Sequence, residues 1–151
     1  MKVGLLALFF AFLLLGVAEA AEKYFVGTQV CAQCHEEEYA TYRKHSKKAH
    51  SFDSIVKMRD RLDQEEVRKC YRCHTTGYGK PGGFKDETTT PGLKNVGCEA
   101  CHGPGSLHVE SESTEDIINS AEEIRGVCGT CHTKEIIEAF GVQPLLHGGA
   151  H

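Results

Sequence analysis

The sequence predicts a mainly α-helical fold with a high loop content. Several segments begin with helix-capping residues or space their apolar residues as one face of a helix does. Glycine and proline interrupt the chain repeatedly, above all between Thr75 and Leu93, which is expected to be one long loop. No segment shows the apolar–polar alternation that is typical of a half-buried strand.

Helix signals place five helical segments along the chain. The clearest start is Asp63-Gln64-Glu65-Glu66, which has the form of a capping box and opens a helix that runs to His74. Ser113-Thr114-Glu115-Asp116 is expected to cap the longest helix, whose apolar stripe leads towards Cys128. The expected helical segments are Glu36 to His50, Ser54 to Asp60, Asp63 to His74, Ser113 to Cys128, and Lys134 to Phe140, the last being stopped by Gly141 and Pro144.

The first twenty residues have the pattern of a secretory signal peptide. Lys2 makes a short basic start, Val3 to Val17 is an apolar run, and Ala18-Glu19-Ala20 has the small-x-small form of a cleavage site. The alternative is an uncleaved membrane anchor, but the run is short for a bilayer span, which needs about 20 residues. We therefore expect residues 1–20 to be removed and residues 21–151 to be exported as one domain with no stable membrane insertion.

The composition of the chain limits both its partners and its core. The formal net charge is -4 and no basic patch stands out, which argues against nucleic acid as a partner. The chain has no tryptophan, and Gly77 to Asn95 offers almost nothing to bury. Because a short chain with sparse apolar residues makes a thin core, something other than side chains must fill the interior.

All eight cysteines fall in pairs with two residues between them. In an exported protein such pairs suggest disulfides, and two pairs together can also form a zinc ribbon. The pairs are Cys31/Cys34, Cys70/Cys73, Cys98/Cys101 and Cys128/Cys131.

The residue after each pair decides against both alternatives, because it is histidine every time. With nine histidines in 151 residues, four such coincidences have a probability of about 10⁻⁵. Covalent haem attachment does require this pattern, since two thiols bind the porphyrin and the adjacent histidine is the proximal iron ligand. The sequence therefore predicts four covalently bound haem c groups whose stacked porphyrins form the core, with proximal ligands His35, His74, His102 and His132.

The remaining histidines are candidates for the opposite faces of the irons. Four bis-histidine haems need four distal ligands, and five histidines are left. We take His45, His50, His108 and His147 as the candidate distal ligands, with His151, the terminal residue, as the spare. Met58 is expected to fill the core rather than to bind iron.

Long stretches of the chain resemble the cytochrome c-554 family of tetrahaem cytochromes. The matching stretches are Tyr24-Phe-Val-Gly-Thr-Gln-Val-Cys-Ala-Gln-Cys-His-Glu-Glu-Glu-Tyr, Cys70-Tyr-Arg-Cys-His-Thr-Thr-Gly-Tyr-Gly, Gly82-Gly-Phe, and Val96-Gly-Cys-Glu-Ala-Cys-His-Gly-Pro-Gly-Ser-Leu-His108. The resemblance covers Tyr24 to about His108. It implies a haem-packed, mainly α fold with stacked porphyrin pairs and a role in periplasmic electron transfer.

The resemblance also implies a distal ligand for the first haem. In that family the histidine after Gly-Pro-Gly-Ser reaches back to this haem, which here pairs His108 with His35. This chain departs from the family at Tyr42, where a tryptophan is usual, so that His45 and His50 compete for the role of the following histidine. It is also short after the fourth motif, which leaves His147 without a counterpart.

The leading functional hypothesis is a periplasmic or extracellular electron carrier that is not an enzyme and whose partners are other redox proteins. Iron with histidine on both faces has no free site and changes only its oxidation state. In some family members the second haem lacks a distal ligand, so the first alternative is a nitrogen-oxide redox enzyme with an open haem at His74. The second alternative is a subunit of an extracellular cytochrome filament, in which one copy lends a histidine to the next.

Overall fold

The structure is a computed structural model, and it describes residues 22–140. Every regular element in this range is a helix, which confirms the mainly α prediction. The α-helices are α2 (Thr28–Cys31), α3 (Glu36–His45), α4 (Phe52–Met58), α5 (Gln64–His74), α6 (Cys98–His102), α7 (Ser106–Ser111), α8 (Ala121–Cys128) and α9 (Lys134–Phe140). The 3-10 helices are η2 (Lys47–His50), η3 (Arg59–Arg61), η4 (Pro91–Leu93) and η5 (Thr114–Asp116). Between residues 22 and 140, no helix has both the length and the apolar character that a membrane span needs.

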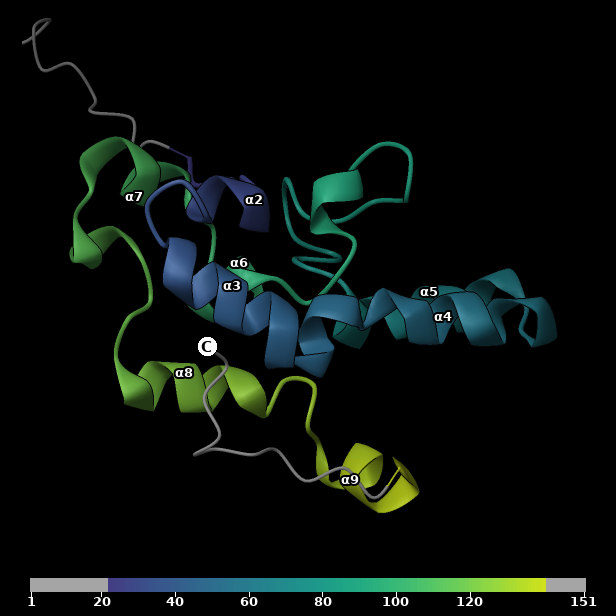
Figure 1. Cartoon of the computed structure of the whole chain (residues 1–151). Coiled ribbons are helices and arrows are strands. Elements are labelled where there is room, and N and C mark those ends of the chain that lie inside the picture. Colours follow the sequence, from purple (N-terminus) through teal and green to yellow (C-terminus); the bar gives the residue numbers. More distant parts are fainter. Residues whose placement is uncertain (1–21, 141–151) are drawn as a thin grey trace, which may run out of the picture.

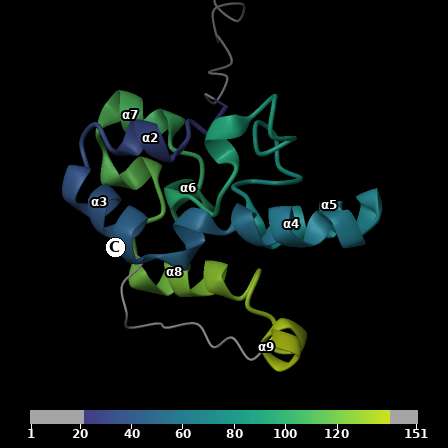
Figure 2. The same ribbon diagram turned by 45° about the vertical axis from the view of Figure 1, so that its right-hand side comes forward.

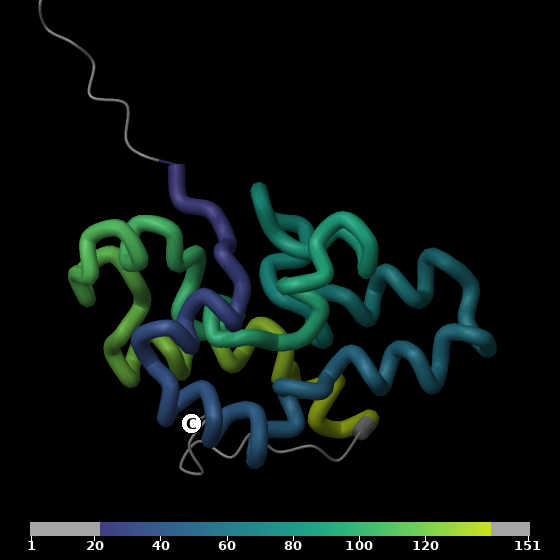
Figure 3. The backbone as a smooth tube through the Cα atoms, turned by 45° about the horizontal axis from the view of Figure 1, so that its top comes forward, coloured from purple at the N-terminus to yellow at the C-terminus, as the bar shows by residue number. Residues whose placement is uncertain are grey.

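Helices α4 and α5 lie side by side as an antiparallel hairpin that projects from the rest of the chain (Figure 1 and Figure 3). The capping box that opens α5 is present as predicted. The Asp63 carboxylate accepts the backbone N–H groups of Glu65 at 2.8 Å and Glu66 at 2.9 Å, and the Glu66 carboxylate accepts the N–H of Asp63 at 2.9 Å. These contacts satisfy N–H groups that a helix start otherwise leaves unpaired, so α5 begins at a defined residue.

The side-chain core is a small cluster where the N-terminal segment, α4 and the loop after α5 meet. Its buried members are Phe25, Phe52, Ile55, Phe84 and Leu93. Tyr71 of α5 packs on this cluster, with its ring 6.1 Å from that of Phe52 and 5.1 Å from that of Phe84. No residue of α8 is buried, so the side-chain core does not extend to that helix.

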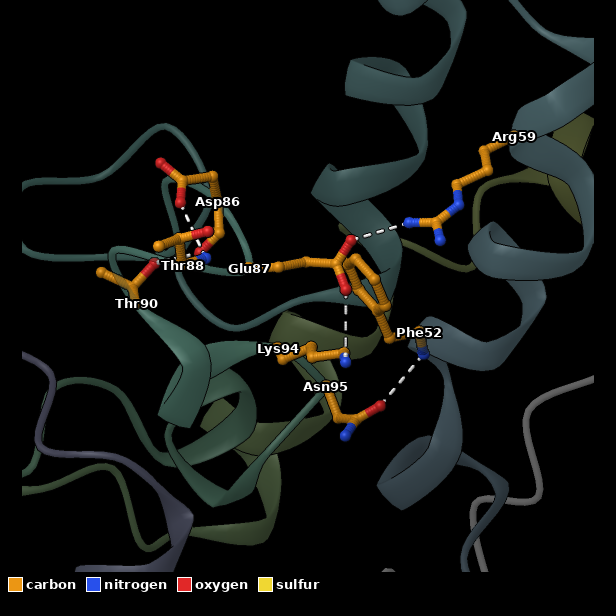
Figure 4. A network of polar contacts seen from close by, with 8 residues as sticks. All are labelled: Phe52, Arg59, Asp86, Glu87, Thr88, Thr90, Lys94 and Asn95. Atoms are coloured by element: carbon orange, nitrogen blue, oxygen red, sulfur yellow. Dashed lines mark hydrogen bonds and ion pairs between the residues drawn. The ribbon is translucent and has the colours of Figure 1, made fainter.

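The loop from Thr75 to Leu93 is as predicted, apart from the short η4 at its end. Backbone bonds of Thr76 hold it closed, because its N–H donates to Leu93 O and its carbonyl accepts from Phe84 N–H, both at 2.9 Å. A polar network ties the same loop to α4 and η3 (Figure 4). In it the Glu87 carboxylate contacts Arg59 at 2.9 Å and Lys94 at 3.3 Å. These side chains are partly exposed, so each ion pair contributes little to the free energy of unfolding.

Three details of the prediction are wrong. Ser113 caps only η5, and Ile117 that follows is extended, so no continuous helix runs to Cys128. Helix α8 begins instead at Ala121, where the Ser120 side chain accepts the Glu123 N–H, and α5 is longer than α8. Figure 2 shows α7 and α8 as separate helices.

The predicted helix from Glu36 to His50 is also interrupted, because Ser46 is extended between α3 and η2. Met58 is 48% exposed and does not fill the core. The predicted signal peptide, His147 and His151 lie outside the described residues, as do Gly141 and Pro144.

Candidate functional site

Each Cys-x-x-Cys-His motif forms a turn of helix, in which residues three and four apart share a face. The second motif ends α5 and the third makes up α6. In the first and fourth motifs the turn continues past α2 and α8, because the N–H of His35 donates to Cys31 O and that of His132 to Cys128 O, both at 2.9 Å. Four similar turns therefore present four similar sets of side chains.

Backbone carbonyls orient three of the candidate ligand rings. The Nδ1 atoms of His74, His102 and His108 lie 2.8 Å, 2.7 Å and 2.9 Å from the carbonyl oxygens of Ser51, Ile118 and Ser113. A carbonyl can only accept, so Nδ1 carries the proton and the neutral ring keeps its lone pair on Nε2. This second contact is the usual way in which a metal-binding histidine is held in one tautomer and one orientation.

His35 and His108 face each other although they belong to distant parts of the chain. Their ring centres are 6.1 Å apart and their planes differ by 23°. Two imidazoles on opposite sides of one metal have ring centres about 6 Å apart, since each metal–nitrogen bond is about 2 Å and each nitrogen is about 1 Å from its ring centre. The separation of the two ring centres therefore equals that expected of two axial ligands of a single iron.

The other two candidate distal ligands in the described residues are His45 and His50. His45 is the last residue of α3 and is exposed. The Nε2 atom of His50 lies 3.2 Å from Arg43 O, so in this arrangement that nitrogen donates to a carbonyl. Nothing in the described residues pairs either ring with a proximal histidine, and their roles stay predictions.

Thiols of different motifs lie close together. The Cys31 and Cys98 thiols influence each other, which raises the pKa of Cys31 and lowers the pKa of Cys98 to about 7. The Cys73 and Cys131 pair behaves alike, with the pKa of Cys73 raised and that of Cys131 lowered to about 6. These values belong to the unmodified polypeptide, because a sulfur bonded to haem has no proton to lose. Two contacts place the motifs: Cys98 N–H donates to Thr28 Oγ1 at 3.3 Å, beside the first motif, and the Cys131 thiol lies 3.8 Å from Arg72 O, within the second.

Cys34 differs from the other seven cysteines, because it is exposed whereas they are partly buried. Cys34 lies in the turn beyond the end of α2, where its N–H donates to Cys31 O at 3.3 Å. A thiol on the surface can still bond to a haem edge, so the attachment role of Cys34 stays a prediction.

A buried carboxylate that the sequence did not single out holds the first and third motifs together. Glu99, between Cys98 and Cys101, is 2% exposed and accepts the backbone N–H groups of Val26, Gly27 and Gly105 at 2.7–2.8 Å. An acidic residue on a short polar helix has no apolar periodicity to mark it as buried. The only sequence signal was its place inside a haem motif.

The residues present fit haem better than a metal ion held by side chains alone. Within residues 22–140, no three His, Cys, Asp or Glu side chains gather closely enough to hold a metal ion. All eight cysteines lie in this range, so the zinc-ribbon alternative has no cluster of sulfurs to rest on. The Nδ1 atom of His132 is buried without a hydrogen-bond partner in the described structure, the one side-chain polar atom of that kind there.

Helical turns that each carry two cysteines and a histidine, in a helical fold with a small side-chain core, define a multihaem c-type cytochrome. The chain belongs to the cytochrome c554 and c-prime family, whose family model matches residues 30–103. Members of this family are generally electron carriers.

A curated relative supports the same assignment. The chain is 33% identical over 112 residues to cytochrome c-554 of Nitrosomonas europaea, and the match covers 68% of this chain and 48% of that protein. The chain thus spans about half the length of this relative. No solved structure matches the chain.

Proposed function

We propose that this chain is an exported tetrahaem cytochrome that carries electrons between other redox proteins. The observation that carries the proposal is the closeness of His35 and His108, because the separation of their rings suits the two axial positions of one iron. When bound, haem iron supplies a one-electron couple between the ferric and ferrous states. The polypeptide supplies the attachment thiols, the axial imidazoles and the spacing between the sites.

The contacts between motifs support an arrangement in which the four haem-attachment sites form one row. Cys98 of the third motif contacts Thr28 of α2, which leads into the first motif, and Cys131 of the fourth motif contacts Arg72 of the second. Helix α6, which is the third motif, also contacts α8, which leads into the fourth. The proposed spatial order is therefore first, third, fourth, second, so that each site has a near neighbour to exchange electrons with.

Three further features belong to the proposal. The first is export to the periplasm or beyond, which rests on the signal-peptide pattern of residues 1–20. The second is complete distal ligation by histidine, with His45, His50 and His147 as the remaining candidates. The third is docking to redox proteins rather than catalysis, which follows from irons that have no open position.

Haem content and intact mass test the proposal directly. A pyridine haemochrome assay on the purified protein should give four haems per chain, all retained through acid–acetone extraction. The mass should equal that of residues 21–151 plus four haems. Two or fewer haems, zinc in their place, or a membrane-bound chain that retains residues 1–20 would contradict it.

Carbon monoxide separates electron transfer from the enzyme alternative. An iron with two histidine ligands has no site for the gas, so the spectrum of the reduced protein should hardly change. Binding of one carbon monoxide per chain, together with turnover of nitric oxide or hydroxylamine, would assign an open haem and an enzymatic role instead. A concentration-dependent large assembly would favour a filament subunit.

A further inference from the structure

Glu99 is an isolated carboxylate in the interior of the described structure. It is the second residue of α6, and its residue surface is 2% exposed although no basic side chain forms an ion pair with it. Burial of a carboxylate without partners is costly, so its contacts must compensate. Oε1 accepts the N–H of Val26 and that of Gly105, both at 2.8 Å, and Oε2 accepts the N–H of Gly27 at 2.7 Å.

Two of these donors begin the helices that lead to the facing histidines. Gly27 is the N-cap of α2, which runs into the turn that ends at His35. Gly105 is the N-cap of α7, whose third residue is His108. In both cases the Glu99 carboxylate accepts the backbone N–H of the N-cap glycine itself, which fixes the position of the helix start.

The glycines also explain why the carboxylate can approach so closely. A Cβ atom at Gly105 would stand 3.3 Å from Glu99 Oε1 and 3.8 Å from its Cδ. The backbone of Gly105 is in the ordinary right-handed region, so conformation alone does not require glycine there. Gly27 differs, because its φ of 89° favours glycine.

We propose that Glu99 is a positioning residue for the axial pair His35 and His108, and that its buried negative charge lowers the reduction potential of the haem between them. This inference rests on the proposed function. One carboxylate fixes the starts of both ligand-bearing segments relative to α6, so the separation and the tilt of the two rings depend on it. A nearby negative charge favours ferric over ferrous iron, since the oxidised form carries one more positive charge.

A carboxylate suits this position and an amide does not. Three N–H groups point at two oxygens that accept only. Glutamine has one acceptor and an NH₂ group, so at least one backbone N–H would then face another donor at about 3 Å. Glu99→Gln therefore removes the charge and at least one of the three N–H hydrogen bonds, with little change of side-chain volume. Glu110→Gln is the matched control, because Glu110 is exposed on α7, two residues from His108.

The test compares electron paramagnetic resonance spectra and redox titrations of the oxidised holoprotein. The low-spin signal that His108→Ala removes identifies the haem of His35. In Glu99→Gln this signal should shift or convert to high spin and its potential should rise, while Glu110→Gln leaves both unchanged. In the Glu99→Gln/His108→Ala double variant, the number of high-spin haems should equal that of His108→Ala alone. An unchanged signal and potential in Glu99→Gln would overturn the inference and leave the four-haem proposal standing.

A second variant covers the case in which Glu99→Gln yields no holoprotein. Gly105→Ala presses a methyl group against the carboxylate without removing its charge. It should also shift this low-spin signal, by less than Glu99→Gln does. Gly126→Ala on α8 is its control, because nothing lies within 4 Å of the added atom there. If the Gly105→Ala and Gly126→Ala spectra are the same, Glu99 does not position the ligands.

Discussion

The imidazole rings of His35 and His108 face each other with their centres 6.1 Å apart and their planes 23° from parallel. One ring follows the first pair of cysteines and the other lies on α7, beyond the third pair. The Nδ1 atom of His108 is held by Ser113 O at 2.9 Å, which leaves its Nε2 lone pair available. In the proposed function, ligation of one iron by both rings would tie the first haem unit to the third and close a long loop of the chain.

The small angle between these planes predicts the type of low-spin signal. The anisotropy of a ferric haem with two imidazole ligands depends on the angle between their planes, and nearly parallel rings give an ordinary rhombic spectrum. The haem of His35 should therefore show a rhombic low-spin signal in the oxidised protein. A strongly anisotropic signal, typical of perpendicular rings, would show that this pair is not arranged as described once haem is bound.

Asp63 should make the stability of the α5 hairpin depend on pH. Backbone N–H bonds from Glu66 and Glu65 hold the pKa of Asp63 below its usual 3.8. Its ionised form therefore stabilises the fold above that value, and the contribution is lost as the pH falls through the lowered pKa of the folded state. Asp63→Ala should lower the unfolding temperature at pH 7 and matter less in acid.

The control for this prediction is Asp63→Asn, which keeps a side-chain acceptor but cannot ionise. Thermal unfolding of the three proteins, followed by circular dichroism at several pH values, separates the cap from its charge. A difference between wild type and Asp63→Asn that stays constant from pH 7 to pH 3 would rule out the charge contribution.

Gly83 should be intolerant of any side chain. A Cβ atom there would lie 1.8 Å from Gly77 O, a backbone atom that cannot rotate away. Gly83→Ala must therefore move the loop, at a cost of about 1–3 kcal/mol in the free energy of unfolding. Gly92 in the same loop has nothing within 4 Å of the corresponding position, so Gly92→Ala should change stability little. Equal denaturation midpoints for the two variants would contradict the close approach.

The sequence predicted the features that depend on local patterns. The capping box at Asp63 needs only four consecutive residues, and the loop from Thr75 to Leu93 needs only its glycines and prolines. The predicted helix from Ser113 was wrong because a capping residue and an apolar stripe can belong to separate elements. The chain turns at Ile117, whose neighbour Ile118 donates its N–H to His102 O at 2.9 Å. The spacing of apolar residues cannot predict this tertiary hydrogen bond.

Some residues of the candidate site could also be predicted from the sequence, and others could not. The proximal histidines follow from their spacing to the cysteines, and the pairing of His108 with His35 followed from family resemblance. Glu99 could not be predicted, because its burial depends on three N–H groups from segments far apart in the chain. The exposure of Cys34 could not be predicted either, since the spacing of a motif does not say which of its sulfurs other helices cover. The choice between His45 and His50 also depends on tertiary structure.

Replacement of His108 by alanine tests the central claim most directly. The account predicts that the oxidised His108→Ala protein has one high-spin haem and three haems like those of the wild type. That one haem should bind carbon monoxide when reduced, and its potential should rise, because a strong donor is gone. Val109→Ala, at the exposed neighbouring residue of α7, should match the wild type. If His108→Ala keeps the wild-type number of low-spin haems and binds no carbon monoxide, His108 is not a ligand and the pairing with His35 is wrong.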